Sequence, residues 1–285
     1  MLNCENTQIV IRKTKTDGIG NVLKAFISAK SIHNDVVLHC NPDFIYGNYD
    51  TILDEKYIYS EKNNTKHIED FYTCRLLVLK SEEQDQEHLP IFCNYTDGCQ
   101  NHKLNYLFSF TTLIDWNYNS QQLCKQLKNR VFNVINNLIF KDIIINELQI
   151  MEKQIANGGA DGANGNLAIS VRTWKSKHEN NIDRPYHFDT YKNQIVKVLK
   201  NNNIINVLLS IDNEEYLQNY IDLLQDYKDV NLIILKKNQL NDIQFAMFKV
   251  LILSKCDFLI ANRISTFSEL IFWFSKCKIN VFPLF

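Results

Sequence analysis

Residues 253–270 read LSKCDFLIANRISTFSEL, and they are the clearest indication of the fold of the C-terminal half of the chain. The apolar run Phe258–Ile260 is typical of a buried parallel strand. A short loop follows, and Ser265 and Thr266 stand where a helix should begin. Capping accounts for one hydroxyl there, but Ser268 adds a third. Because the first N–H groups of a helix have no partner within it and its dipole favours negative charge, this helix start predicts a cradle for a phosphate or diphosphate.

The alternation of strand and helix extends back from this stretch to residue 167. Apolar runs and helix-start signals predict the elements in the order strand Leu167–Val171, helix Pro185–Lys200, strand Ile204–Ile211, helix Asn213–Tyr227, strand Val230–Leu235, helix Asp242–Lys255, strand Phe258–Ile260, helix Thr266–Ser275 and strand Ile279–Phe282. Such alternation predicts a parallel sheet with helices on both faces. In such folds ligands bind at the carboxyl ends of the strands.

The N-terminal half shows a weaker form of the same pattern. We expect strands at Ile9–Ile11, Val36–Leu38 and Arg75–Leu79, a helix at Asn21–Ile32, loops and short elements over Tyr46–His102, and a helical stretch over Ser120–Gln154 with breaks near Asn136 and Lys141. Half of the eight glycines fall within Asn157–Asn166, which is typical of an interdomain linker or a mobile loop. The chain is therefore predicted to form an α/β protein with domains at 1–156 and 167–285, joined by a linker at 157–166.

Composition excludes several classes of function. The chain has 285 residues, a formal net charge of −1 and a pI near 6.7, so it offers no basic field for nucleic acid. No run approaches the ~18 apolar residues of a membrane span, and the N-terminus shows no signal peptide. The eight cysteines are scattered, which suits a reducing compartment. We expect a cytoplasmic protein that binds no nucleic acid and has no membrane span.

The first candidate site is the turn Gly18-Ile19-Gly20-Asn21, between a predicted strand and a predicted helix. Gly18 and Gly20 let the backbone approach a ligand closely, and Asn21 can donate hydrogen bonds to it. The same residues also suit an ordinary tight turn. Asp17, beside the turn, is either a turn residue or a general base for a ligand hydroxyl.

Two further candidates end the strands of the C-terminal half. Arg172 closes an apolar strand two residues after Ser170, where a guanidinium is costly unless it is paired. Its forked donors match a diphosphate, although a salt bridge to a buried acid is the alternative. Ser210 and Asp212 end the next strand. The Asp212 carboxylate either accepts hydrogen bonds from a nucleobase or ribose, or caps the following helix.

Together these places resemble the superfamily of fucosyltransferases that use GDP-fucose. Its members open with a G-x-G-N turn, matched by Gly18–Asn21, and the chain keeps the Ser-Thr-Phe-Ser motif intact at Ser265–Ser268, after Cys256-Asp257. Arg172 falls on the first Arg of the family motif His-x-Arg-Arg-x-Asp. The chain departs from that motif where Ser170 replaces the His, Thr173 the second Arg and Lys175 the final Asp. Because the family His helps to read the guanine, GDP and other nucleotides both stay open as the donor's base.

The resemblance implies a GT-B architecture, with two Rossmann-like domains whose parallel sheets face each other across a cleft. The N-terminal domain would serve the acceptor and the C-terminal domain the nucleotide sugar. The implied reaction is inverting, metal-independent transfer of fucose from GDP-fucose to a glycan hydroxyl in glycan biosynthesis, with no cofactor. The implied catalytic residues are Arg172 and Asp17, and the implied donor-binding residues are Gly18, Gly20, Asn21, Ser170, Arg172, Ser210, Asp212, Ser265, Thr266, Phe267 and Ser268.

Two alternatives to this function stay open. The chain could use a different nucleotide sugar, which the missing His favours, or it could be a non-catalytic relic that binds a nucleotide or glycan. A dinucleotide oxidoreductase is less favoured, because the Gly18 turn lacks a third Gly and no acid is obviously placed after Val36–Leu38 to bind a ribose.

Overall fold

The computed structural model of the 285-residue chain divides into two compact units. It describes residues 7–12, 18–31, 33–40, 48–60, 66–73, 91–96, 103–108, 125–156, 165–173, 186–262 and 265–284. The N-terminal unit comprises Met1–Ile144 together with Leu240–Met247, and the C-terminal unit comprises Ile145–Gln239 together with Phe248–Phe285. Each unit contains one five-stranded sheet.

The sheet of the N-terminal unit has the strand order β2-β1-β3-β5-β4. Its strands are β1 (Thr7–Arg12), β2 (Val36–Leu38), β3 (His67–Thr73), β4 (Ile91–Thr96) and β5 (Lys103–Phe108). All neighbouring strands are parallel except β4, which runs antiparallel to β5. The expected strand Arg75–Leu79 lies outside the described residues. Strands β3 and β4 also fall within Tyr46–His102, where the sequence predicts loops and short elements and places its one expected strand at Arg75–Leu79 instead.

The helices of the N-terminal half follow from their apolar spacing. Helix α1 (Ile19–Lys30) buries Val22, Leu23, Phe26 and Ile27, which form one continuous apolar stripe. It begins two residues earlier than expected. Two short 3₁₀ turns follow β2, at Tyr49–Thr51 and Glu55–Tyr57. The long helical stretch is two helices, α2 (Lys125–Asn137) and α3 (Asp142–Ala156), which confirms the predicted break in this region.

The sheet of the C-terminal unit has the order β10-β9-β6-β7-β8, and all of its strands are parallel. Its elements are β6 (Gly165–Val171), α4 (Phe188–Asn201), β7 (Ile204–Ile211), a 3₁₀ turn (Glu214–Tyr216), α5 (Leu217–Gln225), β8 (Asn231–Ile234), α6 (Asp242–Leu253), β9 (Phe258–Asn262), α7 (Thr266–Phe274) and β10 (Asn280–Leu284). Numbered within the unit and taken from β8, the strand order is 3-2-1-4-5, which is that of a Rossmann fold. The predicted α/β alternation is confirmed.

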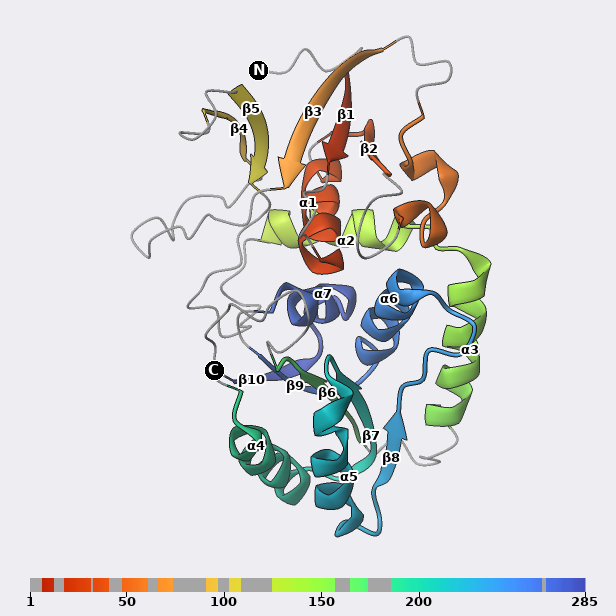
Figure 1. The fold of residues 1–285 in the computed structure, drawn as a ribbon, viewed down its shortest axis with the longest axis vertical. Coiled ribbons are helices and arrows are strands. Elements are labelled where there is room, and N and C mark those ends of the chain that lie inside the picture. The colour runs from red at the N-terminus through yellow and green to blue at the C-terminus, as the bar shows by residue number, and fades with distance from the viewer. Residues whose placement is uncertain are drawn as a thin grey trace. The chain divides into compact units, whose positions relative to one another are not determined.

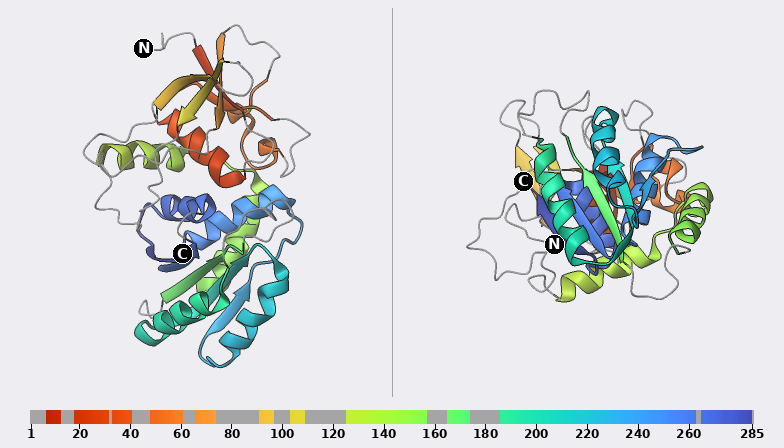
Figure 2. Two further views of the ribbon diagram at one scale, coloured as in Figure 1. Left: turned by 60° about the vertical axis from the view of Figure 1, so that its left-hand side comes forward. Right: turned by 90° about the horizontal axis from the view of Figure 1, so that it is seen from below.

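Helices cover both faces of this sheet. Figures 1 and 2 show α4 and α5 on one face, and α7 with the C-terminal part of α6 on the other. On the first face β6 and β7 pack against residues of α4 and α5 in one buried cluster, which contains Leu167, Ile169, Val207, Tyr191, Ile195, Tyr220 and Leu224. This close-packed cluster holds the carboxyl ends of the strands in place.

An asparagine ladder crosses the other end of the same sheet. Asn231 Nδ2 donates to Asn206 Oδ1 over 3.0 Å, and Asn206 Nδ2 donates to Asn166 Oδ1 over 2.8 Å. Asn206 is paired in register with both Asn166 and Asn231 and is 1% exposed. Its Nδ2 also donates to the Ile155 carbonyl oxygen at the end of α3. The ladder satisfies a buried amide and fixes the alignment of β6, β7 and β8.

The division between the units falls within α3, at Ile144, and not at the expected linker 157–166. All of α3 from Ile145 onward belongs with the C-terminal unit, and its side chains bond there. Glu147 accepts from Asn238 over 2.9 Å, and Glu152 pairs with Lys255 over 3.2 Å. Residues 157–164 of the expected linker lie outside the described residues.

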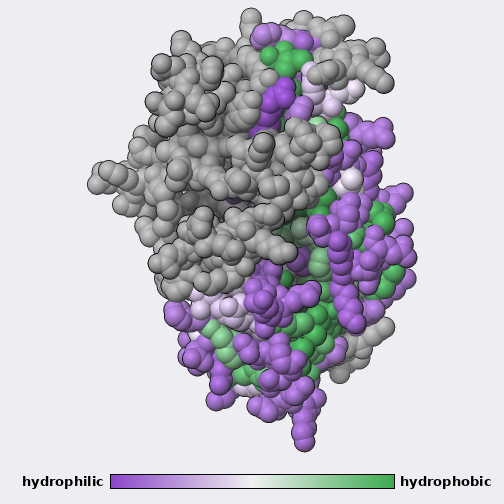
Figure 3. Space-filling view, viewed as in Figure 1, coloured by the Kyte–Doolittle hydropathy of each residue, from purple (hydrophilic) through white to green (hydrophobic). Residues whose placement is uncertain are grey.

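The described surface of the C-terminal unit is mainly hydrophilic in the view of Figure 3, with small hydrophobic patches between the polar residues. Large apolar side chains that are exposed include Ile139, Ile143 and Ile150. Among the helices described here, none combines the length and the apolar character needed to cross a membrane.

Candidate functional site

The candidate site lies at the topological switch point of the C-terminal sheet. Strands β6 and β9 are neighbours, yet the chain leaves them toward helices on opposite faces, α4 and α7. Ligands of open parallel α/β sheets bind in the crevice at the carboxyl ends of two such strands. Register places Ser170 of β6 beside Ala261 of β9 on one side and beside Ser210 of β7 on the other. The predicted residues of three separate segments therefore meet at one sheet edge.

The hydroxyls at the start of α7 divide into two roles. Ser265 is the N-cap, and its Oγ accepts from the Ser268 N–H over 3.4 Å. The Ser268 Oγ instead lies 3.4 Å from Ser170 Oγ, and both hydroxyls are buried. Thr266 and Phe267 are half-buried in the first turn of the helix. One predicted hydroxyl thus caps the helix and a second joins α7 to β6, which leaves Thr266 as the more exposed hydroxyl.

The first turn of α7 also contains a buried carboxylate to which the sequence assigns no role. Glu269 is 0% exposed and accepts from Trp273 Nε1 over 3.2 Å. A negative charge in the first turn is favoured by the helix dipole. The sequence contains a local signal for an acidic residue at this position, because acids are common in the first helical turn after a capping Ser.

Arg172 forms a salt bridge with Asp212, which agrees with the alternative to diphosphate binding that the sequence leaves open for this residue. Arg172 Nη1 lies 3.1 Å from Asp212 Oδ2, and the two side chains are 28% and 14% exposed. Asp212 Oδ1 also accepts from the backbone N–H of Thr173 over 2.9 Å and from its hydroxyl over 2.8 Å. Asp212 therefore fixes the loop that follows β6, and two predicted donor-binding residues are in direct contact.

Asp212 does not cap the following helix, so the capping role that the sequence analysis gives as an alternative for Asp212 is wrong. The side chain of Asn213 takes this role, accepting from the Glu215 N–H over 3.0 Å at the start of the 3₁₀ turn. The Asp212 carboxylate bonds Arg172 and Thr173 instead, because charged and neutral donors together satisfy more of its oxygen lone pairs than capping would.

A group of tyrosines supports the same loop, and the sequence does not predict it. The backbone N–H of Arg172 donates to Tyr191 Oη over 3.3 Å, and Tyr186 Oη lies 3.0 Å from Tyr220 Oη. Burial raises the pKa of both Tyr191 and Tyr220 well above the usual value, and the Asp212 carboxylate acts in the same direction. These phenols therefore stay neutral and act as hydrogen-bonding supports. The sequence gives no signal of this role, because aromatic residues near a helix start usually belong to the core.

The Gly18 turn belongs to the N-terminal unit and forms the start of α1. Gly18 is the N-cap, with φ −76° and ψ 169°, and it has no side chain to cap the helix. A Cβ at Gly18 would meet nothing within 4 Å, so neither backbone strain nor packing requires glycine there. Gly20 is buried and Asn21 half-buried in the first turn. Asp17 lies outside the described residues.

Comparison with known proteins identifies the fold. No family model matches the chain, and no curated protein matches it by sequence. Among solved structures it is similar to the fucosyltransferase NodZ from Bradyrhizobium, with a TM-score of 0.50 and 12% identity over 98% of this chain and 95% of that one. It also resembles POFUT1 in complex with GDP, with a TM-score of 0.49 and 10% identity over 97% of this chain and 99% of that one.

The likeness to NodZ establishes the fold class. The chain is an α/β protein of the GT-B kind, built from two Rossmann-like units, as the sequence predicts. The sheet of the N-terminal unit departs from a purely parallel arrangement only at β4 among the described strands.

Proposed function

We propose that this protein is a glycosyltransferase that transfers fucose from GDP-fucose to a hydroxyl of a glycan acceptor. One observation carries the proposal: Arg172 and the hydroxyl-rich start of α7 follow the two strands that flank the switch point of a Rossmann-like sheet. A cation and a helix N-terminus at this edge suit the diphosphate of a nucleotide sugar. The fucosyltransferase NodZ has a similar fold, which agrees with fucose as the transferred sugar.

The proposed reaction is a single inverting displacement without a metal. An acceptor oxygen attacks the anomeric carbon of fucose, the bond to the diphosphate breaks, and its electron pair leaves with GDP. Arg172 and the N-terminus of α7 stabilise the charge that develops on the diphosphate. One donor of this kind contributes about 3 kcal/mol to lowering the barrier, so Arg172→Ala should lose about 100-fold in turnover.

In this mechanism Asp212 positions Arg172, and Asp17 takes the proton from the acceptor hydroxyl. Gly18, Gly20 and Asn21 form a second donor-binding element at the start of α1, where the first N–H groups receive no side-chain cap from Gly18. Ser170 and Ser210 line the sheet edge beside the diphosphate cradle of Ser265–Ser268.

A second candidate uses a nucleotide sugar other than GDP-fucose. Ser170 stands where the family has a His, and its hydroxyl contacts Ser268. A serine in this position supplies no imidazole to a guanine, which favours a different base. The third candidate, a binding protein without turnover, differs from both in that it would bind a donor and never consume it.

Calorimetric titration of the purified protein with GDP, UDP, ADP and GDP-fucose in the presence of a chelator tests these candidates. Micromolar GDP binding that weakens at least tenfold in Arg172→Ala, but not in the control Arg130→Ala at an exposed position of α2, supports the proposal. Tighter binding of UDP or ADP than of GDP would show that the donor is a uridine or adenosine diphosphate sugar and not GDP-fucose. Donor binding without release of GDP in a coupled assay with a glycan mixture would favour the binding protein.

A further inference from the structure

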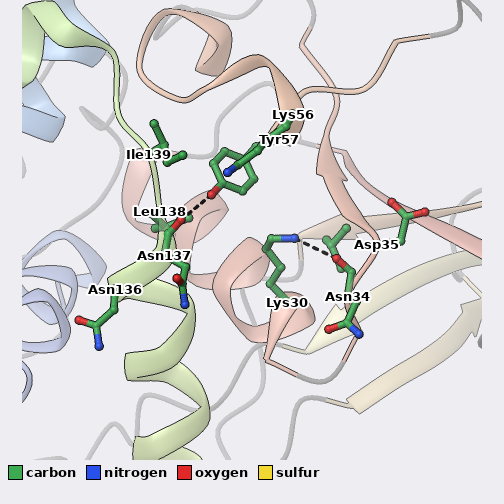
Figure 4. A pocket seen from close by; sticks show the side chains of 10 residues that line it. Lys30, Asn34, Asp35, Lys56, Tyr57, Asn136, Asn137, Leu138 and Ile139 are labelled. Carbon is green, nitrogen blue, oxygen red and sulfur yellow. Dashed lines mark hydrogen bonds between the residues drawn. The ribbon is translucent and has the colours of Figure 1, made fainter.

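A cavity of about 520 Å³ lies in the N-terminal unit, and its described lining contains no residue of the candidate site. Its walls are the end of α1, the turn that leads into β2, the second 3₁₀ turn and the end of α2 (Figure 4). Lys30 ends α1 and Val36 begins β2, so the cavity lies at the amino edge of the sheet. Gly18 lies at the opposite end of the same helix. The cavity is therefore distinct from the predicted donor-binding turn.

Two ammonium groups in the walls of this cavity lie near the same aromatic ring, that of Tyr57. Lys56 Nζ lies 5.0 Å and Lys30 Nζ 5.5 Å from the centre of the Tyr57 ring, which holds both in cation–π contact. Lys30 donates to the Asn34 carbonyl oxygen over 3.0 Å. Within the part of the chain that the structure describes, no carboxylate comes within ion-pair distance of either lysine. The cavity walls thus present two positive charges without a neutralising acid in contact among those residues.

Asp35, the acid among the described lining residues, is already engaged. It accepts from Lys66 over 2.7 Å and from Gln8 over 3.0 Å. Burial lowers the pKa of Lys30, Asp35 acts in the opposite direction, and the neighbouring Lys56 ammonium lowers the pKa further. The two ammonium groups therefore repel each other, and an anion bound in the cavity beside both would relieve that repulsion.

The rest of the lining suits a sugar. Asn34 and Asn136 bring amide side chains with both donors and acceptors, and both are exposed. Ile139 adds an apolar side chain that is 46% exposed. Tyr57 is held in place, because its hydroxyl donates to the Asn137 carbonyl oxygen over 2.6 Å and Phe26 packs edge-on against its ring. At about 520 Å³ the cavity falls within the usual range for organic ligands and exceeds the need of a single inorganic anion.

We propose that this cavity is a binding site for an anionic saccharide, a sugar that carries a phosphate, sulfate or carboxylate group. The anionic group binds beside Lys30 and Lys56, and the sugar hydroxyls bond the amides of the lining residues Asn34 and Asn136. The site is independent of the donor site, so either can fail without the other.

Glucose 6-phosphate is a suitable probe, with glucose and inorganic phosphate as its two halves. In calorimetric or NMR titrations we expect glucose 6-phosphate to bind more tightly than either half. Because each lysine makes a charge-assisted hydrogen bond, Lys30→Gln and Lys56→Gln should each weaken binding about tenfold. Lys228→Gln, an exposed lysine in the turn after α5, is the matched control and should leave the affinity unchanged.

Three outcomes would overturn the proposal. If glucose 6-phosphate does not bind at millimolar concentration, the cavity is not a binding site for an anionic saccharide. If inorganic phosphate binds as tightly as glucose 6-phosphate, the site recognises the anion and not the sugar. Unchanged affinity in the Lys30→Gln/Lys56→Gln variant would place the ligand elsewhere. Lys56 is exposed, so Lys56→Gln remains informative even if the change at the half-buried Lys30 impairs folding. Binding of GDP, measured on the same variants, should not change.

Discussion

Asp212→Asn tests whether the Arg172–Asp212 pair builds the candidate site. The change keeps the shape of the side chain and its acceptor for the Thr173 N–H, but removes the charge that faces Arg172 at 3.1 Å. The side chains of Arg172 and Asp212 are 28% and 14% exposed, so this ion pair is intermediate between a surface pair and a buried pair. A surface pair contributes at most about 1 kcal/mol to stability, whereas breaking a buried pair costs about 3–5 kcal/mol. We therefore expect Asp212→Asn to lower the free energy of unfolding by about 1–2 kcal/mol.

A double-mutant cycle measures the pairwise part of this effect. Arg172→Ala alone leaves the Asp212 carboxylate without its cation, so the double variant Arg172→Ala/Asp212→Asn should lose less stability than the sum of the two single changes. The expected coupling is about 1 kcal/mol or more, measured by urea unfolding followed by circular dichroism. If the two costs add to within about 0.5 kcal/mol, the pair contributes nothing specific and the reasoning is wrong.

The same variant also tests positioning. Loss of one hydrogen bond to a charged group corresponds to about a tenfold loss in affinity, so Asp212→Asn should bind GDP about tenfold more weakly by calorimetry. Wild-type GDP affinity in a folded Asp212→Asn protein would refute the positioning role of Asp212, and the proposed function would then rest on Arg172 and the start of α7 without it.

Three other predictions concern separate parts of the chain. Gly18→Ser should leave the melting temperature unchanged or slightly raised, because Ser caps helices well and a Cβ meets no atom there, yet it should weaken GDP binding if the backbone of the turn touches the donor. Asn206→Ala should lower the free energy of unfolding by about 1–3 kcal/mol in urea titrations, because it removes the donor to Asn166 Oδ1 and the acceptor for Asn231 Nδ2. A loss under about 0.5 kcal/mol would show that the asparagine ladder does not stabilise the fold. Burial raises the pKa of Asp35, but the hydrogen bonds from Gln8 and Lys66 outweigh this effect and leave the pKa in the folded protein below its usual value. The Asp35 carboxylate therefore stabilises the fold above the unfolded pKa, and this contribution disappears as the pH falls through the folded pKa. Lys66→Met should reduce this acid-dependent part of the unfolding free energy in urea titrations across the acid range, and an unchanged pH profile would contradict it.

The fold of the C-terminal half is largely predictable because its signals are local. Apolar runs of four to eight residues and helix-start residues lie within a few positions of each other, so the strand Ile204–Ile211 is predicted to the residue. Helix starts are less precise. The helix expected from Pro185 begins at Phe188, after its cap at His187.

The pairings within the site are not predictable from these signals, because they depend on strand order. Arg172 and Asp212 are 40 residues apart, and only the neighbouring placement of β6 and β7 brings them together. The contact of Ser170 with Ser268 likewise needs β9 beside β6. Hydrophobic periodicity specifies which residues are buried but not which strand lies next to which. It therefore yields the candidates as separate positions and leaves their partners open.

The N-terminal half is harder to predict for a different physical reason. Strands β4 and β5 form an antiparallel pair on one side of the sheet, and their sequences Ile91–Thr96 and Lys103–Phe108 mix polar and apolar residues. Strands near an edge carry less apolar signal than central ones, because fewer of their side chains face a core. Strand β1, which lies between β2 and β3 and fully buries Ile9, Val10 and Ile11, is predicted correctly.

The two outer strands of the C-terminal sheet have a consequence for self-association. An open edge offers unpaired N–H and C=O groups on which another chain can add a strand. Strand β8 has only four residues, so it presents a short template. Strand β10, at the other side, contains Pro283, which has no N–H to donate. Both margins of the sheet therefore discourage the growth of aggregates by strand addition, although its interior strands are among the most apolar segments of the chain.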